Sequence, residues 1–150
     1  MKKKQKTVVG RSEYIDLPDW GIYGILAKID TGARTSALHV EDLEEVDKDH
    51  VRFHVIVDRT SKVDPVLVHA DVVKWAKVRS SSGHYNVRCF VKTRMVMGPI
   101  EKDVELSLDS REKMNYRMLL GRKALTPHFV VDVGKQHGLG RKKSLYIERD

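Results

Sequence analysis

Apolar and polar residues alternate with a period of two along most of the chain. Side chains on a strand point alternately to the two faces of a sheet, so this period predicts half-buried β-strands. Residues 51–58 place four apolar side chains on one face, with Ile56 as the exception. The same alternation recurs over residues 87–97 and 104–108. These runs indicate strands of a two-sided sheet or barrel.

Shorter apolar runs add further candidate strands, at residues 22–29, 66–73, 117–120, 129–133 and 145–147. Turn-forming residues separate the runs, at residues 18–21, 60–65, 80–83 and 98–99. One short helix is expected, at residues 122–125 ahead of Pro127. The pattern predicts a single all-β domain over residues 11–134, with a flexible basic tail at 1–10 and a basic C-terminal extension at 135–150.

The composition agrees with a folded, soluble domain. The chain has 150 residues, 41% of them apolar, which is typical of an ordinary globular domain. No apolar run approaches the ~18 residues of a membrane span, and the basic start lacks the apolar stretch of a signal peptide. The single cysteine, Cys89, cannot form an internal disulfide and is expected to be a buried thiol. We therefore expect a cytoplasmic protein without a membrane segment.

The net charge of +7 resides in the two ends of the chain. Four lysines within residues 1–6 and three basic residues at 141–143 account for it, and the 21 basic residues that remain equal the 21 acidic ones. The neutral remainder is polarised. Residues 41–49 hold six acidic residues, whereas residues 72–98 hold six basic residues and no acidic one. Nucleic acid is therefore not expected as the main ligand.

The segment richest in candidate chemistry is Asp30-Thr31-Gly32-Ala33, which directly follows the apolar run 22–29. A carboxylate at the end of a buried strand must be hydrogen-bonded or protonated. Gly32 permits backbone geometry that other residues resist, and the Thr31 hydroxyl can fix the loop. Taken alone, the segment is also compatible with a structural Asx-type turn. A second segment, Met118-Leu119-Leu120-Gly121-Arg122, lies about 90 residues downstream.

These two segments, in this order and spacing, resemble those of retropepsin-like aspartic proteases. The similarity is greater to a bacterial and archaeal retropepsin-like family labelled ATP-dependent zinc proteases, and it extends over residues 27–39, 78–83 with Arg88, and 118–125. It covers nearly all of residues 11–134. The resemblance implies a retropepsin-like closed β-barrel with one short helix, acting as a homodimer.

The resemblance also implies the chemistry. Asp30 from each of two subunits would share one proton and hydrolyse a peptide bond, with Thr31 and Gly32 supporting the pair. A hairpin turning at residues 80–83 would cover the substrate. The residues expected to contact substrate are Ala33, Arg34, Arg79, Ser80, Gly83 and Arg88. Arg34 has an open alternative, because it could instead point outward or pair with an acid of residues 41–49.

Members of this family are associated with ATP-grasp ligases that add glutamate tails to a ribosomal protein. The expected substrate is accordingly an acidic peptide, such as an oligoglutamate-tailed ribosomal protein. The seven histidines form no zinc motif, and the chain has no phosphate-binding loop, so neither zinc nor ATP is expected as a cofactor. Two other interpretations stay open: a small β-barrel that binds RNA or the ribosome through its basic tails, and a dimeric peptide binder without turnover.

Overall fold

The structure is a computed structural model that describes residues 5–58, 64–79, 82–110 and 115–140. The described chain is mostly β, and the expected helix is present as α1 (Arg122–Leu125). A 3-10 turn, η1, spans Pro18–Trp20. No helix in these ranges is long and apolar enough to cross a membrane. The strands are β1 (Thr7–Val9), β2 (Ser12–Leu17), β3 (Ile22–Ile29), β4 (Ser36–Asp47), β5 (His50–Val55), β6 (Val66–Arg79), β7 (Tyr85–Met97), β8 (Ile100–Asp109), β9 (Met118–Leu120) and β10 (Phe129–Val131).

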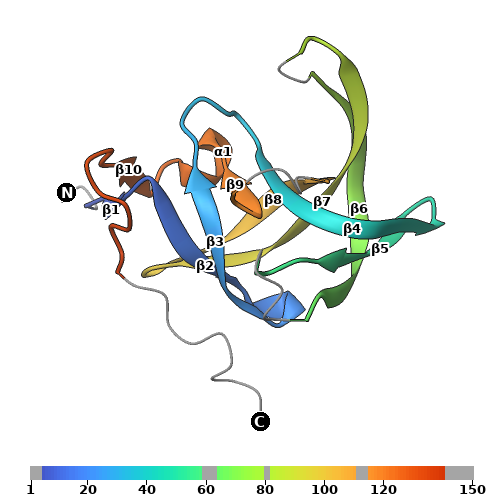
Figure 1. The fold of residues 1–150 in the computed structure, drawn as a ribbon, viewed down its shortest axis with the longest axis horizontal. Coiled ribbons are helices and arrows are strands. Elements are labelled where there is room, and N and C mark those ends of the chain that lie inside the picture. The colour runs from blue at the N-terminus through green and yellow to red at the C-terminus, as the bar shows by residue number, and fades with distance from the viewer. Residues whose placement is uncertain (1–4, 59–63, 80–81, 111–114, 141–150) are drawn as a thin grey trace.

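Eight strands form one sheet in the order β2-β3-β9-β4-β5-β6-β7-β8, with β4 also pairing with β8. The short strand β9 is inserted between β3 and β4, parallel to β3 and antiparallel to β4. The loop from β3 to β4 therefore passes the end of β9, where the chain enters α1 (Figure 1). This crossing brings residues 30–35 against residues that lie far downstream in the sequence.

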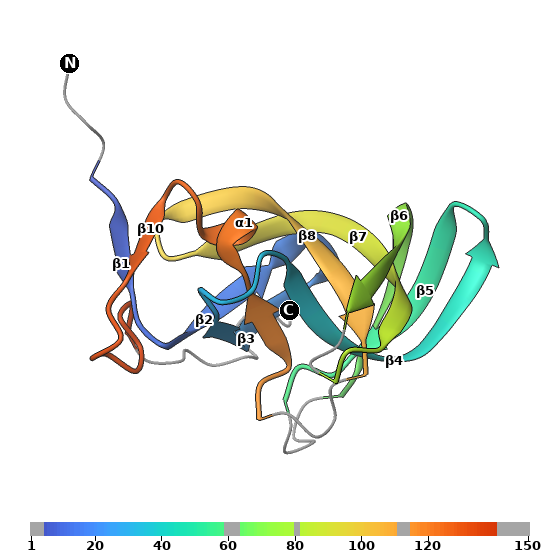
Figure 2. The ribbon, with the colours of Figure 1, turned by 90° about the horizontal axis from the view of Figure 1, so that it is seen from above.

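The eight strands do not close into one barrel as expected, although β8, the last strand of the order, pairs back with β4. Strands β2 and β7 share a single register pair, Asp16 with Val96. The register of β2 against β3 also shifts between Ile15 and Asp16, where β3 carries the extra residue Gly24. Beyond this contact the β6–β7 hairpin arches away from the body of the domain, as Figures 1 and 2 show.

The core follows the predicted alternation. Val51, Phe53 and Val55 of β5 are completely buried, whereas Arg52 between them is exposed. Trp20 of η1 packs edge-on against Phe53, with ring centroids 5.6 Å apart. Cys89 is buried in the same core, and burial raises the pKa of its thiol to about 11. Such a thiol stays protonated at neutral pH and is a poor nucleophile.

The two ends of the described chain are packed against each other. Strands β1 and β10 pair in parallel as a separate two-stranded sheet. Residues 136–139 then return to β2, where the fully buried Glu13 carboxylate accepts backbone hydrogen bonds from Gly10 and Gly138, both at 2.6 Å, and from Leu139 at 3.1 Å. These contacts extend beyond residues 11–134 on both sides, and the division of the chain into tails and domain stays a prediction.

Glu13→Gln is expected to lower the free energy of unfolding by about 2 kcal/mol. An amide NH2 group replaces one carboxylate oxygen in this variant, and it cannot accept a hydrogen bond from a backbone N–H. Urea denaturation measures this loss. Hydrogen exchange at the Gly138 and Leu139 amides should accelerate in the variant. Glu45→Gln, on an exposed residue, is the control and should leave the free energy of unfolding and the two exchange rates unchanged. Equal stability of the two variants would contradict a role for Glu13 in holding the C-terminal segment.

Candidate active site

The Asp-Thr-Gly segment forms a tight loop at the end of β3. The Asp30 backbone N–H donates to the Leu120 carbonyl at 2.9 Å, which continues the pairing of β3 with β9. The Asp30 Oδ1 atom accepts a hydrogen bond from the Gly32 N–H at 2.9 Å. The Asx-type turn, which the sequence allowed as an alternative interpretation of this segment, is therefore present. Asp30 is partly buried, while Thr31 and Gly32 are exposed.

The start of α1 holds this loop in place through its backbone. The Arg122 N–H donates to the Ala33 carbonyl at 2.8 Å, and the Lys123 N–H donates to the Arg34 carbonyl at 3.0 Å. These N–H groups lie in the first turn of the helix, where they have no intrahelical acceptor. The loop carbonyls satisfy them, so α1 and the loop fix each other's position.

Three residues that sequence reasoning did not assign to the site complete this attachment. The Arg122 guanidinium donates to the Thr31 carbonyl at 3.0 Å. The Ser36 Oγ atom accepts the Gly121 N–H at 3.0 Å, and both residues are buried. Arg122 directly follows Gly121 in the second segment, and this position in the sequence could have indicated a contact with the loop. No sequence signal distinguished this role of Ser36.

The predicted site residues fall into three groups. Asp30, Thr31, Gly32, Ala33 and Arg34 share the loop after β3. Arg34 is exposed and forms no ion pair within the described chain, so its suggested pairing with residues 41–49 is not observed.

The second group lies at the end of the β6–β7 hairpin, where residue 79 pairs with residue 85. The Arg79 guanidinium lies over the Tyr85 ring, 5.9 Å from its centroid. Gly83 has φ +89°, a conformation that favours glycine in a turn. Ser80 lies outside the described residues. This register shows that β6 and β7 form a hairpin, while residues 80–81 of the predicted turn lie outside the described residues.

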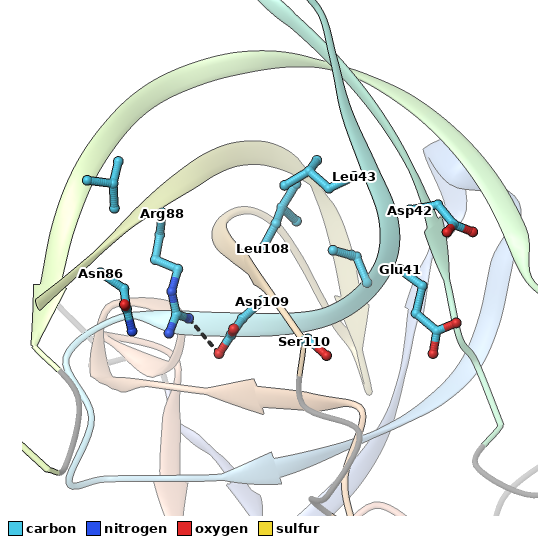
Figure 3. Close-up of a pocket in the computed structure, with 10 residues that line it drawn as sticks. Glu41, Asp42, Leu43, Asn86, Arg88, Leu108, Asp109 and Ser110 are labelled. Carbon is cyan, nitrogen blue, oxygen red and sulfur yellow. Dashed lines mark ion pairs between the residues drawn. The ribbon is translucent and has the colours of Figure 1, made fainter. Parts of the chain in front are cut away.

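The third group is Arg88, which lies in a pocket between β4, β7 and β8 (Figure 3). Its guanidinium pairs with the Asp109 carboxylate at 2.5 Å, and the two side chains are only 18% and 24% exposed. The described lining of this pocket includes no residue of the Asp-Thr-Gly loop. The structure therefore does not place Arg88 beside Asp30 within one chain.

Much of the basic stretch is already neutralised within the sheet. Lys74, Lys92 and Arg94 form ion pairs with the β8 residues Glu105, Asp103 and Glu101. Lys77 and Arg79 form no ion pair with the part of the chain described. The uncompensated positive charge of the hairpin therefore lies toward its end.

The described residues contain no group of three or more His, Cys, Asp or Glu side chains that could hold a metal ion. His39, beside the loop, is fully buried, and its Nε2 lies 3.2 Å from the Glu41 carboxylate. His39 is thus a buried side chain of β4.

A strand that ends in Asp-Thr-Gly, beside an inserted strand that ends in an apolar pair and Gly, is the arrangement of retropepsin-like proteins. The family model described as retropepsin-like aspartic endopeptidase RimB matches residues 8–142. The chain belongs to this family, which confirms the resemblance seen in its sequence.

Curated relatives carry a different name. Proteins called "Probable alpha-L-glutamate ligase" from Desulfotalea psychrophila and Parasynechococcus marenigrum are 32% and 33% identical over 145 and 147 residues. These matches cover 93% and 96% of this chain but only 31% and 32% of the relatives, so the chain spans about a third of their length. A crystal structure of a Legionella pneumophila protein of unknown function has a TM-score of 0.75 at 24% identity, covering 91% of this chain and 100% of that one. This likeness supports the fold.

Proposed function

We propose that this protein is an aspartic-type peptidase whose active unit is a homodimer with one Asp30 from each subunit. The observation that carries the proposal is the position of Asp30, in a loop fixed by both β9 and α1 with one carboxylate oxygen held by the Gly32 N–H. Aspartic protease chemistry needs two carboxylates that share one proton. One chain supplies one Asp-Thr-Gly segment, so a two-fold symmetric dimer completes the pair.

In this mechanism the ionised Asp30 takes a proton from a water molecule as the water oxygen attacks the scissile carbonyl carbon. The protonated Asp30 of the other subunit donates its proton to the carbonyl oxygen. Collapse of the tetrahedral intermediate breaks the C–N bond, and the proton taken from water passes to the leaving amine. Thr31 and Gly32 keep the carboxylates oriented, and the Arg122 contact to the Thr31 carbonyl keeps the loop closed.

The proposed substrate is an acidic peptide, such as the oligoglutamate tail of a glutamylated ribosomal protein. Arg34, in the same loop as Asp30, is exposed and forms no ion pair within the described chain, and Arg79 and Gly83 lie at the end of a hairpin suited to cover a peptide. Arg88 and Ala33 are proposed as further contacts. The relatives named as glutamate ligases support a substrate that carries added glutamate.

Wild-type protein is expected to cleave a peptide with an oligoglutamate tail about tenfold faster than the same peptide with a glutamine tail, as expected if one charge pair aids binding. Mass spectrometry of the products measures both rates and the bond cleaved. Raising the salt concentration should reduce the difference, because exposed charges are screened. Equal rates would overturn the acidic substrate and leave the peptidase proposal intact.

A further inference from the structure

The β6–β7 hairpin carries the core-facing side of its two strands out beyond the core. Directly opposed residues of antiparallel strands share a face of the sheet. Three such pairs lie on one face of the hairpin: Trp75 with Cys89, Lys77 with Val87, and Arg79 with Tyr85. Cys89 belongs to the buried core, whereas the other five residues are exposed, where the hairpin arches away from the body of the domain (Figure 1).

The exposed part of this face has a large apolar component. Trp75 is 41% exposed, Tyr85 is 62% exposed and Val87 is 61% exposed. Val87 is diagonally across from Trp75 and two residues from Tyr85, so the three side chains are neighbours on the sheet. Exposed apolar side chains that are grouped in this way, with aromatic rings among them, are typical of binding surfaces.

Two cations lie among these apolar side chains. Lys77 and Arg79 are exposed and form no ion pair with the part of the chain described. The contact of Arg79 with the Tyr85 ring orients the guanidinium without neutralising it. The residues that join the two strands, 80–84, are three serines, a glycine and a histidine, so none of them is acidic. The face therefore offers positive charge to an anionic partner.

The opposite face of the hairpin differs in this respect. Its cations Lys74 and Arg88 are paired with Glu105 and Asp109 of β8. Their charge is already satisfied within the sheet, so an anionic partner is expected on the Trp75 face.

The order of the side chains along β6 defines the peptide that would fit. Trp75, Lys77 and Arg79 follow one another at two-residue steps, about 7 Å apart along an extended strand. The side chains on one side of an extended peptide are spaced by the same step. A peptide with a large apolar residue, and with carboxylates two and four positions away from it, can therefore meet all three.

We propose that this face of the β6–β7 hairpin binds a peptide segment that combines a large apolar residue with glutamate or aspartate at two-residue steps. The apolar side chain packs against Trp75 and Val87, and the carboxylates pair with Lys77 and Arg79. This inference rests on the proposed function, whose acidic substrate it refines. A tail of glutamate alone would use only the cationic part of the face, so the preferred substrate also contains an apolar residue.

The test measures peptide binding by fluorescence anisotropy, with the full chain carrying Asp30→Asn so that no peptide is cleaved. The labelled probe has a central leucine, glutamates two and four positions away on each side, and serines between them, so it matches the face in either direction. We expect it to bind about tenfold more tightly than the same peptide with alanine in place of leucine. Glutamine in place of glutamate should weaken binding by a similar factor.

Two variants and two matched controls locate the surface. Trp75→Ala should weaken binding of the leucine peptide about tenfold, and Lys77→Met about threefold. Because Lys77→Met removes only an exposed charge, it tests the face even where Trp75→Ala impairs folding. Leu67→Ala, at a residue 52% exposed on the same strand, and Lys92→Met, at a side chain 58% exposed on β7, should leave binding unchanged.

Equal binding of the leucine and alanine peptides would overturn the proposal, as would binding that Trp75→Ala and Lys77→Met both leave unchanged. Tighter binding of a short uridine oligonucleotide than of the leucine peptide would also overturn it, because the rings and cations would then serve a nucleic acid.

Cleavage by the wild type is measured separately. Binding at the hairpin without any cleavage would support this surface and overturn the peptidase. Cleavage of the leucine and alanine peptides at one rate, with no preference in binding, would overturn this surface and support the peptidase.

Discussion

Asp30→Asn is expected to lower the rate of peptide cleavage about a thousandfold or more, the effect typical of losing a general acid–base group. An amide cannot take a proton from water, and it cannot share a proton with the second carboxylate. The measurement is single-turnover cleavage of an oligoglutamate-tailed peptide by wild type and variant. A variant that retains wild-type rates would remove Asp30 from the mechanism, whereas no cleavage by the wild type itself would favour peptide binding without turnover.

The substitution should spare the fold. The asparagine side-chain oxygen can still accept the hydrogen bond that Gly32 donates to Asp30 Oδ1. A matched control exists in the same chain, because Asp132 Oδ1 accepts the Gly134 N–H at the same distance of 2.9 Å. Asp132→Asn makes the same chemical change in an exposed turn away from the loop, and we expect it to keep full activity.

Mixing the two proteins tests the proposed dimer. If each active site takes one Asp30 from each subunit, a mixed dimer holds only one of the two carboxylates. The activity per wild-type chain should then fall in proportion to the wild-type fraction, once subunits have exchanged. Activity that stays constant per wild-type chain would show that one chain suffices, and a shared carboxylate pair would then be excluded.

The sequence predicted the strands whose two faces differ in polarity. The run 22–29 is β3, and residues 51–58 and 87–97 overlap β5 and β7, because one face of each strand packs in the core. Strand β4 was missed. Its first five residues are buried on both faces and its last seven are exposed, so it has no alternation to detect. The candidate strand at 145–147 lies outside the described residues.

The candidate site was predictable only as far as local sequence determines it. Asp30 and Gly32 form the loop that their spacing indicates. Strand β2 escaped detection because the buried Glu13 places a charge where the pattern requires an apolar residue. The N–H groups that donate hydrogen bonds to the Glu13 carboxylate come mainly from residues 138–139, far along the sequence. Arg88 was grouped with the substrate contacts, and its ion pair with Asp109 of β8 was not foreseen. Such long-range pairings depend on topology, which periodicity does not specify.

Gly121→Ala is expected to destabilise the domain by about 3 kcal/mol or more and to abolish activity. A Cβ atom at position 121 would lie 2.4 Å from the Thr35 carbonyl oxygen and 2.8 Å from that of Ala33. Both obstacles are backbone atoms of the loop after β3, so relief requires moving the loop away from β9. That movement would break the Arg122 N–H bond to the Ala33 carbonyl, which fixes the position of Asp30.

Urea denaturation of Gly121→Ala against Gly134→Ala measures the effect. A Cβ at Gly134 would meet only the Asp132 Oδ1 atom, at 3.2 Å, and Gly134 is exposed. We expect the control to change the free energy of unfolding by less than about 1 kcal/mol, as is usual for exposed positions. Because domains are stable by only about 5–15 kcal/mol, the loss at Gly121 should be plain in the denaturation midpoint. Equal midpoints for the two variants would contradict the close approach of β9 to the Asp-Thr-Gly loop, and with it the support proposed for Asp30.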